Sequence, residues 1–170
     1  MKSKKNLVLV GMMGSGKSTV GSLISKKLNT NFIDIDDLIE KNTSMSIAEI
    51  FQQKGEDYFR NLEQQITLKE LNSSNNIISL GGGAFINDKI RKEILSNSTS
   101  FWLSWRNQTL LNRIKNSKKR PIAFNLNDNQ LLKLIEEREK IYIKAHFKIN
   151  CHKLTKTEIV KKILKLYEFN

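Results

Sequence analysis

The chain has 170 residues, which is enough for one domain with a hydrophobic core and too short for two ordinary ones, so we expect a single domain over residues 1–170. No apolar stretch approaches the roughly 20 residues that span a membrane, which excludes a membrane-spanning class and predicts a soluble protein without a membrane partner. The net charge of +12 would suit nucleic-acid binding, but the lysines are scattered and lack interleaved aromatic residues, so we expect no nucleic-acid partner.

The first predicted elements are a strand, a glycine-rich loop and a helix. Leu7–Val10 is expected to be a buried strand, too short an apolar run for a signal peptide. Ser18–Leu28 carries apolar residues at helical spacing. Thr30–Ile35 is expected to be a second strand, and alternation along it would place Asp34 and Asp36 on one face.

The next stretch is predicted to be helical. A helix is expected to run to about residue 41, and Ser46 and Glu49 have the spacing of a capping box that opens another helix. Gly55 interrupts the pattern, and Glu56–Leu71 has the features of a long helix. Three helical segments therefore separate the second predicted strand from the third.

Strands and helices alternate over the remaining chain, which predicts a parallel sheet covered on both faces. A third strand is expected at Asn76–Leu80, directly before three glycines. Between residues 115 and 129 the apolar periodicity disappears and the only proline, Pro121, occurs. The single cysteine, Cys151, cannot form an internal disulfide, which suits the cytoplasm. The other expected elements are helices at Asn87–Leu95, Gln108–Ile114, Gln130–Ala145 and Thr155–Tyr167 and strands at Ser100–Leu103 and Phe147–Asn150.

The glycine-rich loop matches the P-loop pattern, with Gly11, four residues, then Gly16, Lys17 and Ser18. Glycines let backbone N–H groups surround phosphate oxygens at a helix N-terminus. A tight turn would explain single glycines but not the lysine and serine at these offsets. We therefore expect Lys17 to reach the β- and γ-phosphates of a nucleotide and Ser18 to supply a hydroxyl to Mg²⁺. The residues expected to bind the nucleotide here are Gly14, Ser15, Gly16, Lys17, Ser18 and Thr19.

Other polar groups follow two more predicted strands. Asp34 and Asp36 end the second strand, and Gly81–Gly83 follows the third. In open parallel sheets ligands bind beyond the carboxyl ends of the strands, so these residues are expected to meet the P-loop. One aspartate near the metal and one at the acceptor hydroxyl would serve a kinase. The alternatives are a helix cap for the aspartates and a flexible turn for the glycines.

Arginines are scarce in this chain, since only six of its 29 basic residues are Arg. Where lysine is so strongly preferred, an arginine marks a position that needs a rigid bidentate group for carboxylate or phosphate. We expect Arg91 and Arg106 to be surface residues. The remaining candidates are Arg60, Arg113, Arg120 and Arg138.

The motifs together closely resemble those of shikimate kinase. They are GMMGSGKSTVG, FIDIDDLIE, SIAEIFQQKGEDYFRNLE, SLGGG, Arg120–Pro121 and Arg138 followed four residues later by Tyr142, in this order over most of the chain. The resemblance implies a P-loop fold like that of nucleoside-monophosphate kinases, an α/β fold with three layers and a five-stranded parallel sheet. It also implies the transfer of a phosphoryl group from ATP to shikimate, giving shikimate 3-phosphate and ADP on the route to chorismate and aromatic amino acids.

The resemblance also assigns roles. Asp34 would bind Mg²⁺ through water, and Asp36 would orient or deprotonate the attacking hydroxyl. Glu63 would hold Arg60, which would bind the shikimate carboxylate with Arg138 and the backbone of Gly81, Gly82 and Gly83. Arg113 would lie against the adenine. Lys17 and Arg120 would neutralise the transferred group, as residues expected to be catalytic with Asp36.

Within the single kinase domain, residues 36–62 would bind the substrate and residues 115–129 would form a lid, and we expect a monomer. One alternative is another kinase of this fold, acting on gluconate or a nucleoside monophosphate, although two aspartates would repel a phosphorylated acceptor. A basic nucleic-acid-binding ATPase and a regulatory nucleotide-binding module are the more distant alternatives.

Overall fold

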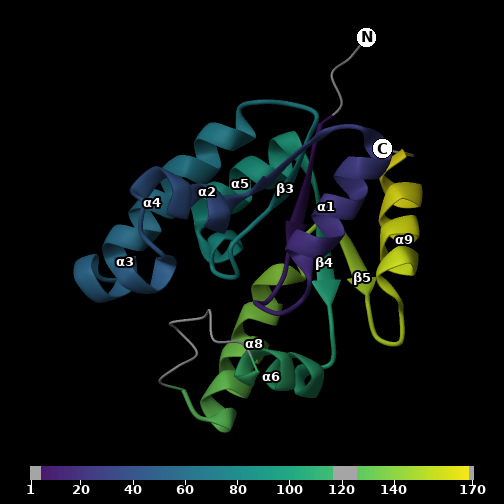
Figure 1. Ribbon diagram of the computed structural model, residues 1–170. Coiled ribbons are helices and arrows are strands. Elements are labelled where there is room, and N and C mark those ends of the chain that lie inside the picture. Colours follow the sequence, from purple (N-terminus) through teal and green to yellow (C-terminus); the bar gives the residue numbers. More distant parts are fainter. Residues whose placement is uncertain (1–4, 117–125, 169–170) are drawn as a thin grey trace.

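The computed structural model describes residues 5–116 and 126–168 (Figure 1). The described residues form a five-stranded parallel sheet in the order β2-β3-β1-β4-β5, flanked by helices. The strands are β1 (Asn6–Val10), β2 (Asn31–Asp34), β3 (Asn76–Ser79), β4 (Ser98–Ser104) and β5 (Phe147–Asn150). The helices are α1 (Lys17–Leu28), α2 (Ile35–Thr43), α3 (Ile47–Lys54), α4 (Glu56–Leu71), η1 (Ala84–Ile86), α5 (Asp88–Asn97), α6 (Asn107–Lys115), α8 (Asp128–Tyr142) and α9 (Lys156–Glu168).

The central strand β1 is buried along its whole length because both faces of the sheet are covered. Val8 and Val10 pack into a core with α2 to α6 and α8 on one face. Leu7 and Leu9 pack on the other face against α1 and α9. This alternation explains why β1 appears in the sequence as a continuous apolar run.

The order of the strands brings three loops together. β1 pairs with β3 on one side and β4 on the other, so the segments that follow these strands leave the same edge of the sheet. The Leu80 N–H donates to the Leu9 carbonyl at 3.2 Å, which keeps the two chains paired up to the glycines. The P-loop, the triple-glycine loop and the β4–α6 connection are therefore neighbours.

Most expected elements are confirmed within a few residues, and the long helix has the expected bounds. The capping box of Ser46 and Glu49 opens α3 as predicted. One local prediction is wrong: β2 ends at Asp34, and Asp36 lies in the first turn of α2. Strand alternation therefore does not relate the two aspartates. Instead, the Asp34 carboxylate caps α2 by accepting the Asp36 N–H at 3.1 Å.

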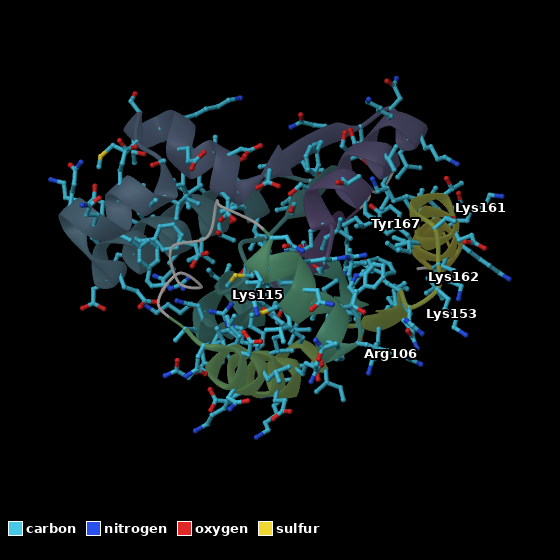
Figure 2. The ribbon with its side chains drawn as sticks, turned by 60° about the horizontal axis from the view of Figure 1, so that its bottom comes forward. Arg106, Lys115, Lys153, Lys161, Lys162 and Tyr167 are labelled. Carbon is cyan, nitrogen blue, oxygen red and sulfur yellow. The ribbon has the colours of Figure 1, made fainter. Side chains whose placement is uncertain are left out.

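Basic side chains gather where the sheet ends at β5. Figure 2 shows Lys161 and Lys162 on α9, with Lys153 and Arg106 nearby. Arg106 is exposed, as the sequence predicted for it. Within the described ranges, no helix combines the length and the apolar character needed to cross a membrane.

Candidate active site

The P-loop connects β1 to α1 with a backbone that requires glycine. Gly11, Gly14 and Gly16 have φ angles of 141°, 79° and 90°, in the region that residues with a side chain rarely adopt. The loop leads directly into the N-terminus of α1, where the N–H groups of the first turn have no partner within the helix. This geometry forms an anion site from backbone atoms alone.

Lys17 begins α1 and lies largely buried beneath the loop. Its Nζ atom donates to the Gly11 carbonyl at 2.8 Å and to the Met12 carbonyl at 3.1 Å. These bonds compensate a buried ammonium group inside the loop, so Lys17 is already held beside the place where phosphates would bind.

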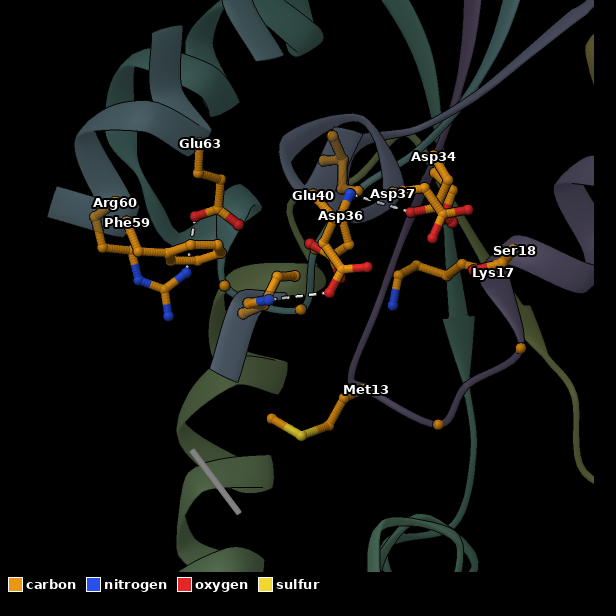
Figure 3. A pocket seen from close by; sticks show the side chains of 18 of the residues that line it. Met13, Lys17, Ser18, Asp34, Asp36, Asp37, Glu40, Phe59, Arg60 and Glu63 are labelled. Atoms are coloured by element: carbon orange, nitrogen blue, oxygen red, sulfur yellow. Dashed lines mark hydrogen bonds and ion pairs between the residues drawn. The ribbon is translucent and has the colours of Figure 1, made fainter. Parts of the chain in front are cut away.

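A cavity of about 460 Å³ extends from the P-loop to α4 and α8 (Figure 3). It contains both the P-loop residues expected to bind the nucleotide and the residues expected to bind the acceptor. The predicted residues that line it are Gly14, Gly16, Lys17, Ser18, Thr19, Asp34, Asp36, Arg60, Gly81, Gly82, Gly83 and Arg138.

Asp36 has the most strongly perturbed carboxyl group of this cavity. Its pKa is raised to about 7, first because burial disfavours the ionised form and then because Asp34 and Glu63 are negative neighbours. Lys17 and Arg60 oppose this shift only in part. A carboxyl group whose pKa is near neutrality is suited to accept a proton from a hydroxyl group.

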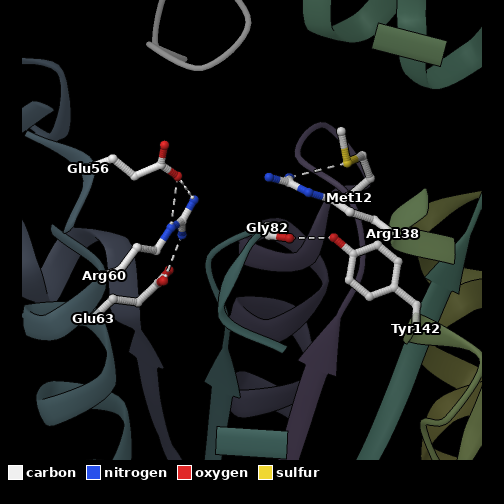
Figure 4. Close-up of polar contacts among 7 residues, drawn as sticks. All are labelled: Met12, Glu56, Arg60, Glu63, Gly82, Arg138 and Tyr142. Atoms are coloured by element: carbon white, nitrogen blue, oxygen red, sulfur yellow. Dashed lines mark hydrogen bonds and ion pairs between the residues drawn. The ribbon is translucent and has the colours of Figure 1, made fainter. Parts of the chain in front are cut away.

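Arg60 lies on α4, where two glutamates bind its guanidinium group (Figure 4). Its Nη1 donates to Glu63 Oε2 at 2.7 Å, and its Nε and Nη2 both donate to Glu56 Oε1 at 3.2 Å. Burial opposes the charge of Arg60, but the two carboxylates outweigh it and raise the pKa of the guanidinium. The predicted Glu63 contact is therefore confirmed, and Glu56 is a partner that the sequence analysis missed.

Arg138 reaches the cavity from α8 on the other side of the triple-glycine loop (Figure 4). Its Nη1 contacts the Met12 sulfur at 3.6 Å. Four residues later on the same helix, the buried Tyr142 donates its hydroxyl hydrogen to the Gly82 carbonyl. Burial raises the pKa of Tyr142 to about 12, so this hydroxyl stays a donor at neutral pH.

The triple-glycine loop packs tightly against the acidic and basic groups. A Cβ atom on Gly81 would lie 2.6 Å from both Asp36 Oδ1 and Glu63 Oε1. A Cβ atom on Gly83 would collide with the Arg60 guanidinium. The loop after β3 is thus closely packed, which argues against the alternative of a flexible turn.

A second cavity of about 360 Å³ borders the other side of the P-loop. The indole of Trp105 and the guanidinium of Arg113 contact each other and line it together with Thr155 and Lys156. Ser15, the remaining predicted loop residue, lines this cavity rather than the first one. Arg113 lines this cavity together with Gly14 and Gly16 of the P-loop.

Several residues of the site gave no usable signal in the sequence. Phe51 and Phe59 form an apolar wall of the first cavity, with ring centroids 4.8 Å apart, and the sequence analysis assigned neither of them a role. Arg91 is not the surface residue that we expected. Its side chain is only 12% exposed, and its guanidinium pairs with Asp88 and donates to the Phe85 and Ile86 carbonyls, so it fixes the segment after the glycines. Arg120 lies outside the described residues.

The cavity has two chemically different halves. One offers backbone N–H groups and a lysine, which suit a polyphosphate, and the other offers a carboxyl group of raised pKa and two guanidinium groups. The fold and this site define a small-molecule kinase of the P-loop class.

Comparisons with known proteins specify this class. The model of the shikimate kinase family matches residues 13–168. A shikimate kinase of Sulfurihydrogenibium is 42% identical over 160 residues, covering 94% of this chain and 96% of that protein. The chain therefore belongs to the shikimate kinase family and is an ATP-dependent kinase.

Solved structures agree with this assignment. The shikimate kinase of Aquifex aeolicus superposes with a TM-score of 0.86 at 40% identity, covering 96% of each chain. The enzyme of Acinetobacter baumannii, solved in complex with shikimate, gives 0.92 at 30% identity, covering 98% of this chain and 94% of that one. A gluconokinase of Sinorhizobium meliloti, at 16% identity and a TM-score of 0.63, shares the fold alone, so the gluconate alternative is not favoured.

Proposed function

We propose that the first cavity binds the triphosphate of ATP at the P-loop and shikimate between Asp36, Arg60 and Arg138. The shikimate 3-hydroxyl oxygen would attack the γ-phosphorus, the bond from that phosphorus to the bridging oxygen of ADP would break, and the hydroxyl proton would leave toward Asp36. The products are shikimate 3-phosphate and ADP. The observation that carries this proposal is that a P-loop and a carboxyl group of pKa about 7 share one cavity.

Lys17 and the loop backbone are proposed to hold the phosphates. Lys17 already lies between two loop carbonyls, so its ammonium has only to exchange these acceptors for phosphate oxygens. The N-terminus of α1 adds partial positive charge at the same place. Stabilisation of the charge that builds up on the transferred group is the main task of a phosphoryl-transfer site.

Asp36 is proposed to accept or orient the acceptor proton. A base must be ionised to act, and a pKa of about 7 leaves a large fraction of Asp36 ionised at neutral pH. The same burial that raises the pKa also makes the ionised carboxylate more basic than an exposed one. Protonation of Asp36 would leave it unable to take the proton.

The carboxylate of shikimate is proposed to bind between Arg60 and Arg138, against the backbone of the triple-glycine loop. Glu56 and Glu63 together accept from all three Arg60 nitrogens, which leaves one N–H on each of Nη1 and Nη2, so the position of this guanidinium is set before the substrate arrives. Preorganised groups lose less entropy on binding. The apolar faces of Phe51 and Phe59 would contact the carbon ring of the substrate.

The donor set beside the P-loop fits Mg²⁺. Ser18 and Asp34 line the same cavity and offer only oxygen atoms, which Mg²⁺ prefers (Figure 3). Among the described residues no group of three or more His, Cys, Asp or Glu side chains could hold a metal by itself. Mg²⁺ typically keeps several waters and uses few protein ligands together with phosphates. When bound, the ion would neutralise phosphate charge, with Ser18 as ligand and Asp34 holding a coordinated water.

The wider setting is also part of the proposal. Residues 1–170 would form one kinase domain, with residues 36–62 around the acceptor and residues 115–129 as a lid that brings Arg120 to the transferred group. We also propose that the protein acts as a monomer. The buried free thiol of Cys151 suits the cytoplasm. We propose ATP and shikimate as the partners.

A coupled assay of ADP release tests the proposed function. With Mg²⁺ and ATP present, shikimate should give the fastest turnover, and gluconate and nucleoside monophosphates should give little above the ATPase background. Identification of shikimate 3-phosphate by NMR establishes which hydroxyl is modified. Equal turnover with gluconate, or ADP release that does not depend on an acceptor, would contradict the proposal.

A further inference from the structure

We propose that Trp105 is a positioning residue of the nucleotide site. Together with Arg113, it binds the carbonyl groups of two consecutive P-loop residues, Gly14 and Ser15, and thereby orients the phosphate-binding backbone. This inference rests on the proposed function of the P-loop as the ATP site. It assigns a role to a side chain that the periodicity of the sequence does not mark.

The first contact is a hydrogen bond from the indole to the loop. Trp105 follows β4 directly, and its Nε1–H donates to the Ser15 carbonyl at 2.9 Å. A peptide unit is planar and trans, so its carbonyl and its N–H point in opposite directions. When the Ser15 carbonyl points to Trp105, the N–H of Gly16 must point away from the indole.

The second contact fixes the preceding peptide unit. Arg113 Nη1 donates to the Gly14 carbonyl at 3.2 Å. The N–H of Ser15, in the same peptide unit, donates in the opposite direction to the Met12 carbonyl at 3.1 Å. This unit is therefore held at both ends, and the loop cannot rotate it without losing two hydrogen bonds.

Trp105 also supports Arg113. The guanidinium carbon lies 3.9 Å from the centroid of the indole ring, a close cation–π contact. The β4–α6 connection and α6 thus supply two side chains that support each other and bind neighbouring carbonyls. A loop rich in glycine has many accessible conformations, and these two contacts reduce their number.

The location of the pair predicts which ligand is affected. Trp105 and Arg113 line the second cavity with Gly14 and Ser15, whereas the acceptor groups line the first. Loss of the indole should therefore weaken nucleotide binding and leave shikimate binding in place. A purely structural role would instead lower the thermal stability and impair both ligands together.

Two variants separate the functions of the indole. Trp105→Phe keeps an aromatic face for Arg113 and removes the N–H, and Trp105→Leu removes both. Loss of one hydrogen bond should raise the Kd for ADP about threefold to tenfold in the Phe variant. The Leu variant should bind ADP more weakly still. Isothermal titration should show that the Kd for shikimate changes less than twofold in the Phe variant.

Fluorescence adds a measurement that a loss of stability alone would not change. ADP should change the tryptophan emission of the wild type, and this change should be lost in Trp105→Phe, where Trp102 alone remains. Arg113→Ala should weaken ADP as well, and the double variant Trp105→Phe/Arg113→Ala should lose less than the product of the two single effects. Arg106→Ala, an exposed arginine beside Trp105, is the matched control and should bind ADP normally.

The outcomes distinguish this inference from the proposed function. If the wild type fails to bind ADP or to phosphorylate shikimate, the proposed function itself is wrong. If the wild type is active and Trp105→Phe binds ADP within twofold of it, only the role of Trp105 is overturned. Should Trp105→Leu not fold, the Phe variant decides alone. Equal weakening of ADP and shikimate would likewise reject the positioning role.

Discussion

The two halves of the cavity are built in different ways. The nucleotide half consists mainly of backbone atoms from one continuous stretch, Gly11 to Thr19, with Lys17 held inside it. The acceptor half consists of side chains from α2, α4 and α8 that meet at the triple-glycine loop. A site made of contiguous backbone depends on local conformation, whereas one made of distant side chains depends on the packing of the whole fold.

The largest expected effect concerns the proton acceptor. Asp36→Asn should lower kcat about 100- to 10,000-fold, because an amide cannot accept the proton from the hydroxyl. Titration should show that ADP still binds normally, since the P-loop is unchanged. Asp37→Asn, at the neighbouring position on the same cavity, is the control and should lose less than tenfold. Comparable losses in both variants would remove the special role of Asp36.

Removal of a positive charge from the nucleotide half should impair phosphoryl transfer from ATP and leave shikimate binding unchanged. Lys17→Met should lower kcat about 100- to 1,000-fold, because it removes a positioned cation from the transferred group. Shikimate should bind this variant as it binds the wild type. Lys26→Met, at the exposed end of the same helix, should have normal kinetics. Normal turnover by the Lys17 variant would overturn the phosphate assignment.

The acceptor half should be sensitive to the shape of its cation. Arg60→Lys keeps the charge but cannot reproduce the planar group that contacts both glutamates and is aimed at a carboxylate. We expect the KM for shikimate to rise roughly 10- to 100-fold, with the KM for ATP nearly unchanged. Steady-state kinetics with each substrate varied in turn measures the difference. Equal losses for ATP and shikimate would contradict the placement of Arg60, and Arg106→Lys is the control.

The pH dependence should report Asp36. Its pKa of about 7 means that the carboxyl group is protonated below that pH and unable to act as a base. The value of kcat/KM for shikimate should therefore fall about tenfold for each pH unit below 7 and level off above it. The residual activity of Asp36→Asn should lack this acidic limb. An identical limb in that variant would assign the titration to another group.

The smallest expected effect is on stability. The raised pKa of Asp36 means that the folded protein binds more protons than the unfolded chain between about pH 4 and 7, so its free energy of unfolding decreases as the pH rises through this range. Asp36→Asn should then unfold at a higher temperature than the wild type at pH 8, by roughly 2–4 °C for each 1 kcal/mol recovered. The difference should vanish near pH 4. Calorimetry without ligands is the measurement, and a lower Tm at pH 8 would argue against a destabilising carboxylate.

The same contrast explains what could be predicted from the sequence. The P-loop and β1 could be predicted because their residues are consecutive and because the positive φ angles of the P-loop require glycine. The contact of Glu63 with Arg60, which the resemblance implied, is confirmed. The hydrogen bonds of Trp105 and Tyr142 could not be found in this way. Their hydrogen bonds reach Ser15 and Gly82, which lie far away in the sequence, so only the packed fold reveals them.

Local structure also decided one case against the sequence-based expectation. The alternation of a strand predicted that Asp34 and Asp36 share one face, but the cap formed by Asp34 starts a helix between them. Both aspartates still reach the cavity, by a different geometry. For Arg91 the sequence offered no sign of its carbonyl partners, because they belong to the short η1 segment, which the periodicity did not predict.

The close packing at Gly81 and Gly83 has a consequence for inhibitor design. A Cβ atom at either position would already collide with the charged groups opposite, so this wall leaves no room for a side chain of its own. A competitive compound that adds bulk there would have to displace Asp36 or Arg60, the residues that give it affinity. Added groups should instead extend toward the phosphate loop, where a single molecule could occupy both substrate positions at once.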